Sequence, residues 1–187
     1  MTRRARIALL VLTALAASAI AGCNKTQTAT VAETEGIYVT VDELTYQVQL
    51  SRLLNPASPE DSHYLRGLAE DEQELDADEV WFAVFIRVEN ETKEELSAAD
   101  EFEIVDTQDS RFEPVELDED VNSFVYEPGS IGPGELLPVP NSPPSDNTIQ
   151  GALILFKLKT EALYNRPLEF EIHSSQGGDD AVVDLDV

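Results

Sequence analysis

Apolar and polar residues alternate with a period of two along much of the middle of this chain. The alternation is clearest in residues 45–50 and 168–172, where amides or glutamates separate the apolar positions. This spacing predicts strands that bury one face and present the other to water. Residues 80–88 and 152–158 are apolar in both registers for part of their length, which predicts strands covered on both faces. Trp81 lies in the first of these runs, so we expect it to pack in the core and not to stack on a sugar.

Shorter strands are expected around residues 102–104, 112–115 and 124–126, separated by turns that contain Asp, Ser and Pro. Helical signal is confined to residues 58–68, which begin with a capping-box pattern, and to residues 160–164. Parallel strands need a long crossover, and the sequence offers no long helix to form one. We therefore expect an all-β fold, an antiparallel sandwich of about seven to nine strands with one or two short helical turns.

Residues 128–144 carry six prolines. Proline has no backbone N–H and cannot sit in a central strand. A long loop and an edge segment are expected there.

The N-terminus has a basic segment followed by an apolar run, as in a secretory signal peptide. Three arginines precede residue 7, and residues 7–21 are apolar except for one Thr and one Ser. This run of about 15 residues is shorter than the ~20 that a helix needs to cross a bilayer, and no basic stop-transfer cluster follows it. We expect residues 1–22 to be removed.

The signal ends in Ile20-Ala21-Gly22-Cys23, which resembles the lipobox of bacterial lipoproteins. The resemblance implies cleavage between Gly22 and Cys23 and a diacylglycerol thioether on Cys23, the single cysteine of the chain. The mature protein would be held at the membrane by lipid, facing outward from the cell. The alternative is an ordinary secretory signal in which Cys23 is incidental.

Composition divides the rest of the chain into three parts. Residues 23–36 are polar or small and are predicted to form a flexible tether. Residues 37–175 are the predicted β-sandwich domain. Residues 176–187 are predicted to be an acidic flexible tail, with a short added strand as the alternative.

Several motifs in order resemble a bacterial family of secreted, often lipid-anchored, immunoglobulin-like (telokin-like) domains of unknown function. They are the strand 81–90, the charged turn 91–96, the strand 102–106, the turn Pro133-Gly134-Glu135 and the strand 151–156. The resemblance implies an immunoglobulin-like sandwich, and it implies no catalytic residues.

Charge excludes one class of partner. The chain has 37 Asp plus Glu against 12 Lys plus Arg, a net charge of -25. Such a surface repels the phosphates of nucleic acids, so no nucleic-acid partner is expected. It also repels an anionic bilayer, so the lipid on Cys23 would have to supply the attachment.

Candidate chemistry is sparse. Seven acids lie in residues 70–79 and three in residues 118–120, but neither run has the glycine and distant glutamate of an EF-hand loop. The two histidines, His63 and His173, are far apart in sequence and have no neighbouring Cys or His. We expect no catalytic residue, cofactor or metal ligand, and we interpret the acidic runs as solvated loops.

These observations favour a non-enzymatic binding or accessory module of the bacterial cell envelope, acting on an unknown envelope protein or polymer. Two alternatives stay open. One is a carboxylate-based cell-wall hydrolase, which would need an acid with a raised pKa in a concave pocket. The other is a module that binds divalent cations through its acidic loops.

Overall fold

The computed structural model describes residues 29–187 and shows an all-β sandwich. The strands are β1 (Val31–Ala32), β2 (Tyr38–Val41), β3 (Leu44–Leu54), β4 (Glu79–Glu89), β5 (Leu96–Ser97), β6 (Phe102–Val105), β7 (Arg111–Phe112), β8 (Ser130–Ile131), β9 (Leu136–Leu137), β10 (Ala152–Lys159), β11 (Leu168–Ile172) and β12 (Ala181–Leu185). The helical elements are α2 (Pro143–Asp146) and the 3-10 helix η1 (Thr160–Tyr164). The described residues contain more strands than expected, because five of the strands span only two residues.

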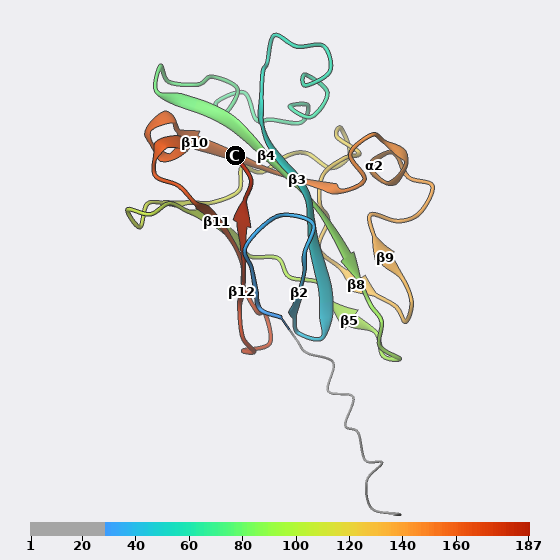
Figure 1. Ribbon diagram of the computed structural model, residues 1–187. Helices are drawn as coiled ribbons and strands as arrows, with labels where there is room; N and C mark the ends of the chain where they lie inside the picture. The colour runs from blue at the N-terminus through green and yellow to red at the C-terminus, as the bar shows by residue number, and fades with distance from the viewer. Residues whose placement is uncertain (1–28) are drawn as a thin grey trace, which may run out of the picture.

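Two sheets form the sandwich. One has the order β1-β12-β11-β6-β7, and the other has the order β10-β4-β3-β2, with β9 pairing beside the end of β4. Among the named strands the pairings are antiparallel, except that β1 runs parallel to β12. Figure 1 shows β12 of the first sheet beside β2 of the second, and a small β5–β8 ribbon at the lower end. The predicted antiparallel sandwich is confirmed.

Strand β4 is buried on both faces, as its sequence predicted. Phe82 and Ile86 point into the main core between the sheets. Trp81 and Phe85 point to the opposite face and join a second apolar cluster. Trp81 is 1 % exposed, which confirms that it is a core residue.

The second cluster exists because a long loop folds over the outer face of β3 and β4. Residues 55–78 project beyond the upper ends of these strands (Figure 1) and bury Tyr64 and Leu68 against Trp81. The helical turns predicted for residues 58–68 are hydrogen-bonded turns without a helix. The turn predicted for residues 160–164 is present as η1.

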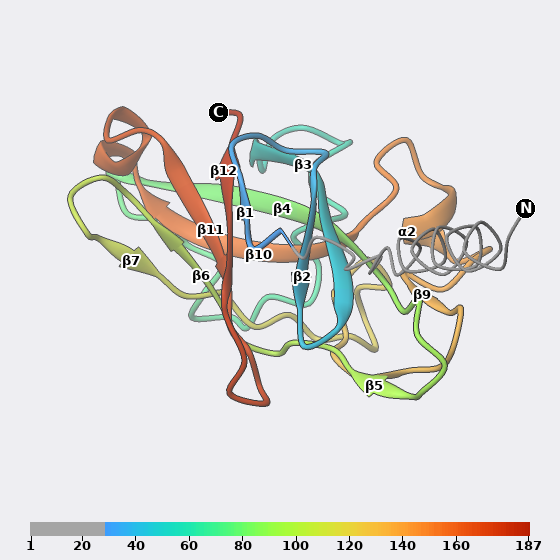
Figure 2. The same ribbon diagram turned by 60° about the horizontal axis from the view of Figure 1, so that its bottom comes forward.

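The proline-rich stretch contains the loop and the edge segment that were predicted. Strand β9 lies inside it and pairs antiparallel with Val88 and Glu89 of β4. The short helix α2 was not predicted, although Pro143 and Pro144 stand in its first turn, where proline loses no hydrogen bond. Figure 2 shows α2 and β9 at the end of the molecule opposite β7.

Part of the predicted C-terminal tail is an inner strand, so the flexible tail was wrong for residues 181–185 and the alternative, a short added strand, is what the structure shows. Strand β12 lies between β1 and β11, and its buried residues Ala181, Val183 and Leu185 alternate with Val182 and Asp184. This period-two pattern is short and acidic, which made it look like loop composition. Its side chains are nevertheless those of a strand with one apolar face.

The end of the predicted tether also belongs to the fold. Val31 and Ala32 pair with β12, and the Glu35 carboxylate accepts hydrogen bonds from the N–H of Ser51 and of Asp186, at 3.0 and 3.1 Å. The domain therefore includes residues on both sides of the predicted limits, 37 and 175.

The predicted signal peptide, its cleavage site between Gly22 and Cys23, and the predicted lipidation residue Cys23 lie outside the described residues. Within residues 29–187, no helix is long and apolar enough to cross a membrane.

Candidate functional site

A groove opens along the free edge of β10, where residues 113–126 cross it. This segment pairs with the strand through two isolated β-bridges, Pro114–Phe156 and Val125–Leu153. Between the bridges the segment departs from the sheet, because residues 117–122 form a loop of their own. A hollow of about 390 Å³ remains beneath it.

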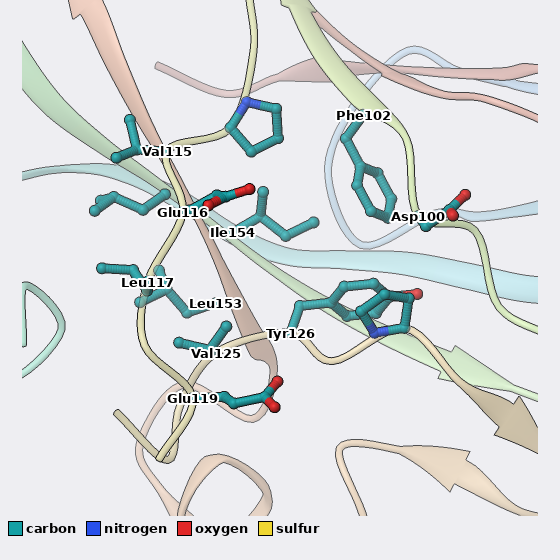
Figure 3. A pocket seen from close by; sticks show the side chains of 13 residues that line it. Asp100, Phe102, Val115, Glu116, Leu117, Glu119, Val125, Tyr126, Leu153 and Ile154 are labelled. Atoms are coloured by element: carbon teal, nitrogen blue, oxygen red, sulfur yellow. The ribbon is translucent and has the colours of Figure 1, made fainter. Parts of the chain in front are cut away.

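The floor of this hollow is apolar. Figure 3 shows Phe102 and Tyr126 on one side, Val115, Leu117 and Val125 on the other, and Ile154 between them. Phe102, Tyr126 and Ile154 are buried, whereas Val115 and Val125 are half-buried and reach solvent. The outer edge of β10 supplies the floor, because the strand is apolar on both faces and its partner β4 covers only the other edge.

Two tyrosines fix one wall of the hollow. The Tyr126 hydroxyl donates to the carbonyl of Ala99 at 2.8 Å, and the N–H of Ala99 donates to the Tyr46 hydroxyl at 2.8 Å. Burial raises the pKa of Tyr46 to about 12 and also raises the pKa of Tyr126. Both hydroxyls are therefore neutral near pH 7 and hold the backbone just before Asp100.

A second hollow of about 490 Å³ adjoins the first. The two share Asp100, Phe102, Pro114 and Glu116 in their walls, and the second adds Glu101, Glu103, Glu113 and His173. We call the two hollows together the acidic groove. The free edge of β10 supplies its apolar floor, and carboxylates line its rim.

Most of the rim carboxylates have no nearby counter-charge. Among residues 29–187, no Lys, Arg or His nitrogen lies within 4.0 Å of five of them. These five are Asp100, Glu101, Glu113, Glu116 and Glu119. The groove therefore presents several unpaired negative charges around an apolar floor.

A charged network closes the far end of the acidic groove. Glu103 of β6 stands directly opposite Glu171 of β11, and Arg111 bridges them with Nη1, which lies 3.0 Å from Oε2 of Glu171. These bonds to Glu171 and Glu103 raise the pKa of the Arg111 guanidinium. A single arginine thus offsets two like charges that would otherwise repel across the strands.

His173 joins this network. Its Nε2 lies 3.6 Å from Glu103 and 3.8 Å from Glu171, while Nδ1 lies 3.2 Å from the Asp180 carboxylate. A backbone hydrogen bond from Ser174, helped by His173, lowers the pKa of Asp180. His173, Glu103 and Glu171 each offer one ligand atom, all within 4.8 Å of one another. These three could hold a divalent ion, but Arg111 competes with it for both glutamates.

The acidic run 70–79, unlike most of the groove acids, is paired with lysines of β10. Lys157 lies 2.7 Å from Glu72 and 5.2 Å from the centre of the Trp81 ring. Lys159 lies 3.2 Å from Asp78 and 3.0 Å from Glu79. A backbone hydrogen bond from Asp76, with the contact to Lys159, lowers the pKa of Glu79. Two lysines of β10 therefore bind this loop to the sheet.

The remaining candidates from the sequence, His63 and residues 118–120, make local packing and hydrogen-bond contacts. His63 packs against Tyr64 and Phe124, with ring centroids 4.1 and 5.2 Å apart. In residues 118–120, the carboxylate of Asp118 accepts from the N–H of Asp120 at 3.0 Å, and Glu119 reaches the groove.

The acids with clearly shifted pKa values in the described residues are Glu79, Asp106 and Asp180, and all three values are lowered. For Asp106, hydrogen bonds donated by Asn165, Ser110 and Gln108 outweigh the opposite effect of burial. A general acid for hydrolysis needs a raised pKa.

The sequence interpretation missed the acidic groove because its members come from separate segments. Asp100 precedes β6, Glu116 follows β7, and Ile154 belongs to β10. One local signal was present: in residues 115–118, Val115 and Leu117 alternate with Glu116 and Asp118. Such alternation marks a segment with an apolar side and an acidic side, whatever its backbone pairing.

No family model matches this chain, and no curated protein matches it. Among solved structures it is similar to the yjhA protein of Bacillus subtilis, at 12 % identity and a TM-score of 0.54, over 82 % of this chain and 99 % of that chain. It is also similar to an uncharacterized β-sandwich protein of Clostridium difficile 630, at 15 % identity, a TM-score of 0.44 and coverages of 82 % and 93 %. A third is the candidate lipoprotein ycdA of Bacillus subtilis strain 168, at 11 % identity, a TM-score of 0.47 and coverages of 79 % and 38 %. The likeness to yjhA shows a shared fold alone.

Proposed function

We propose that this protein is a lipid-anchored, extracytoplasmic binding module of the bacterial cell envelope, and that its ligand occupies the acidic groove. The observation that carries the proposal is the groove itself. An exposed hollow with an apolar floor and a few polar groups at its margin is the usual form of a binding site. Here the floor is preformed by β10, and two buried tyrosines fix the wall beside Asp100.

The membrane anchor in this proposal rests on sequence. The lipobox-like Ile20-Ala21-Gly22-Cys23 follows an apolar run too short to span a bilayer. The immunoglobulin-like (telokin-like) family assignment is part of the same proposal, supported by the order of its motifs and by the sandwich fold. A lipid on Cys23 would place the groove outside the cell, where an envelope protein or polymer can reach it.

A non-enzymatic role is supported by the chemistry of the acids. The clearly shifted acids in residues 29–187 have lowered pKa values, whereas a cell-wall hydrolase needs a proton donor with a raised one. The cation-binding alternative predicts saturable Ca²⁺ binding at residues 70–79 that is lost when both Asp76→Asn and Asp78→Asn are made. A calorimetric titration of the full chain with Ca²⁺ distinguishes it.

Site-specific photocrosslinking in intact cells tests the proposal. A photoreactive phenylalanine analogue replaces Glu116 or Glu119, which are exposed at the groove, and in a matched control it replaces Tyr164, which is 83 % exposed and absent from both hollows. We expect a discrete crosslinked product from the two groove positions and none from Tyr164. Equal products from all three positions, or none from any, would refute the use of the groove.

A further inference from the structure

We infer that the ligand of the acidic groove is a basic segment of a partner protein, with Lys or Arg side chains on the rim and an apolar side chain on the floor. This inference rests on the proposed function and adds the chemical class of the ligand. It depends on how charge and apolar surface are combined at this one place.

Charge complementarity sets the sign of the ligand. Five rim carboxylates have no cationic nitrogen within 4.0 Å among the described residues, whereas Lys157 contacts Glu72 and Lys159 contacts Asp78 and Glu79. Two lysines of β10 therefore offset part of the charge of residues 70–79, whereas these five groove carboxylates remain without a cationic partner among the described residues and can attract an external cation. Anionic polymers and nucleic acids are repelled from the same rim.

The apolar floor favours a basic peptide over a bare cation as the ligand. Val115 and Val125 are only half-buried, and they line the same hollow as the buried Ile154 and Phe102. A metal ion or a hydrated ammonium would satisfy the rim and leave this apolar surface in water. A segment that carries both a basic and an apolar side chain satisfies both, and burial of the apolar part adds about 25 cal/mol for each Å² covered.

Arg111 supplies an intramolecular example of the expected contact. Its guanidinium bridges Glu103 and Glu171 at the end of the acidic groove, where both carboxylates accept from the same Nη1. Glu113 and Glu116 continue the row of acids from that point toward the floor. We therefore expect arginine to bind the rim more tightly than lysine, because its planar group can serve two carboxylates at once.

The edge of β10 is already occupied at two points, which limits the mode of binding. The N–H groups of Val115 and Tyr126 donate to the carbonyls of Leu155 and Leu153, at 2.7 and 2.8 Å. A ligand cannot add a full strand there. Recognition has to come from side chains entering the hollow between the two bridges.

Fluorescence anisotropy with defined peptides tests the inference on the full chain, purified in a non-ionic detergent. The probe is a labelled peptide that alternates Arg with Leu. One control peptide has Ser in place of Leu, and another has Glu in place of Arg. The charge variant is Glu116→Gln with Glu119→Gln, and its matched control is Asp76→Asn with Asp78→Asn, which removes the same charge from another acidic segment.

We expect the Arg–Leu peptide to bind and the Glu–Leu peptide not to bind. The Arg–Ser peptide should bind at least about fivefold more weakly, because it leaves the floor uncovered. The groove variant should weaken Arg–Leu binding by about tenfold, whereas the control variant should change it less than about twofold. Val125→Thr, which keeps the shape of the floor but adds a hydroxyl, should reduce the advantage of Leu over Ser.

Other outcomes would overturn the inference. Equal binding of the Arg–Leu and Arg–Ser peptides, or equal losses in the two charge variants, would show attraction to net charge alone. Binding that requires added Zn²⁺ or Ca²⁺ would assign the site to a metal at Glu103, Glu171 and His173. If no peptide binds while Glu116 still crosslinks in cells, the groove is a binding site for another ligand class; if both fail, the proposed function fails as well.

Discussion

The hydroxyl of Tyr126 donates a 2.8 Å hydrogen bond to the carbonyl of Ala99, which joins the segment over β10 to the residue before Asp100. The N–H of the same Ala99 donates to Tyr46 of β3. Both polar groups of one buried residue are thus satisfied by tyrosines from separate parts of the chain. The wall of the acidic groove is fixed by this pair and not by a continuous strand.

Loss of the Tyr126 hydroxyl should loosen this wall. Tyr126→Phe leaves the buried carbonyl of Ala99 without its partner, so we expect the free energy of unfolding to fall by about 1 to 3 kcal/mol. Urea denaturation measures the change. Tyr164→Phe is the matched control, because that side chain is 83 % exposed, and it should leave stability unaltered. Equal values for the two variants would show that the Ala99 contact contributes nothing.

The same tyrosines predict a loss of stability at alkaline pH. The pKa of Tyr46 is about 12 in the folded protein and 10.0 in its ordinary state, so the folded form retains the proton after the unfolded form has lost it. The contribution of Tyr46 to the free energy of unfolding should be fully present below pH ~10. It should be lost as the pH rises toward 12, a loss of about 2 to 3 kcal/mol. Tyr46→Phe should remove part of this dependence in urea titrations between these pH values. An unchanged alkaline slope in that variant would contradict the assignment.

Strand β12 should be essential to the fold. Val183 is fully buried, whereas its neighbour Val182 points to the other face and is half-buried. Val183→Asp places a charge in the core and should destabilise the protein by more than about 3 kcal/mol. Val182→Asp should cost far less, and thermal unfolding of the two variants compares them. Similar melting temperatures would mean that residues 181–185 do not form a central strand.

Chain truncation tests the same point more severely. A chain ending at residue 175 lacks β12 and exposes the flank of β11, including Phe170. We expect it not to fold, contrary to the domain limits that composition suggested.

Sequence reasoning was sound where local pattern and burial coincide. Strands β4 and β10, which are buried on both faces, could be predicted because a strand with apolar residues in both registers has to be covered on both faces. Strand β12 was only the alternative prediction, since Asp184 and Asp186 made its composition resemble a loop although Val183 and Leu185 keep strand spacing. The acidic groove was missed for another reason: Asp100, Glu116 and Ile154 meet only through tertiary packing, which no local window contains.

The anchor prediction depends on the single cysteine. Cys23→Ser removes the thiol that would carry lipid, so the protein should move from the membrane fraction to the soluble or precursor fraction. Gly22 and the rest of the signal stay unchanged in this variant, which makes it a test of the thiol alone. Cell fractionation and immunoblotting measure the distribution. A cleaved Cys23→Ser protein that remains tightly bound to membranes would exclude the lipid anchor.

Backbone amide shifts of the ¹⁵N-labelled full chain, titrated with the Arg–Leu peptide, test the central claim that ligands bind in the acidic groove. We predict saturable shifts at Asp100, Glu116 and Ile154, which line the groove, and no comparable shifts at Gly134 or Asp146, which line other hollows. Shifts spread evenly over all acidic segments, or concentrated at residues 70–79, would contradict the account.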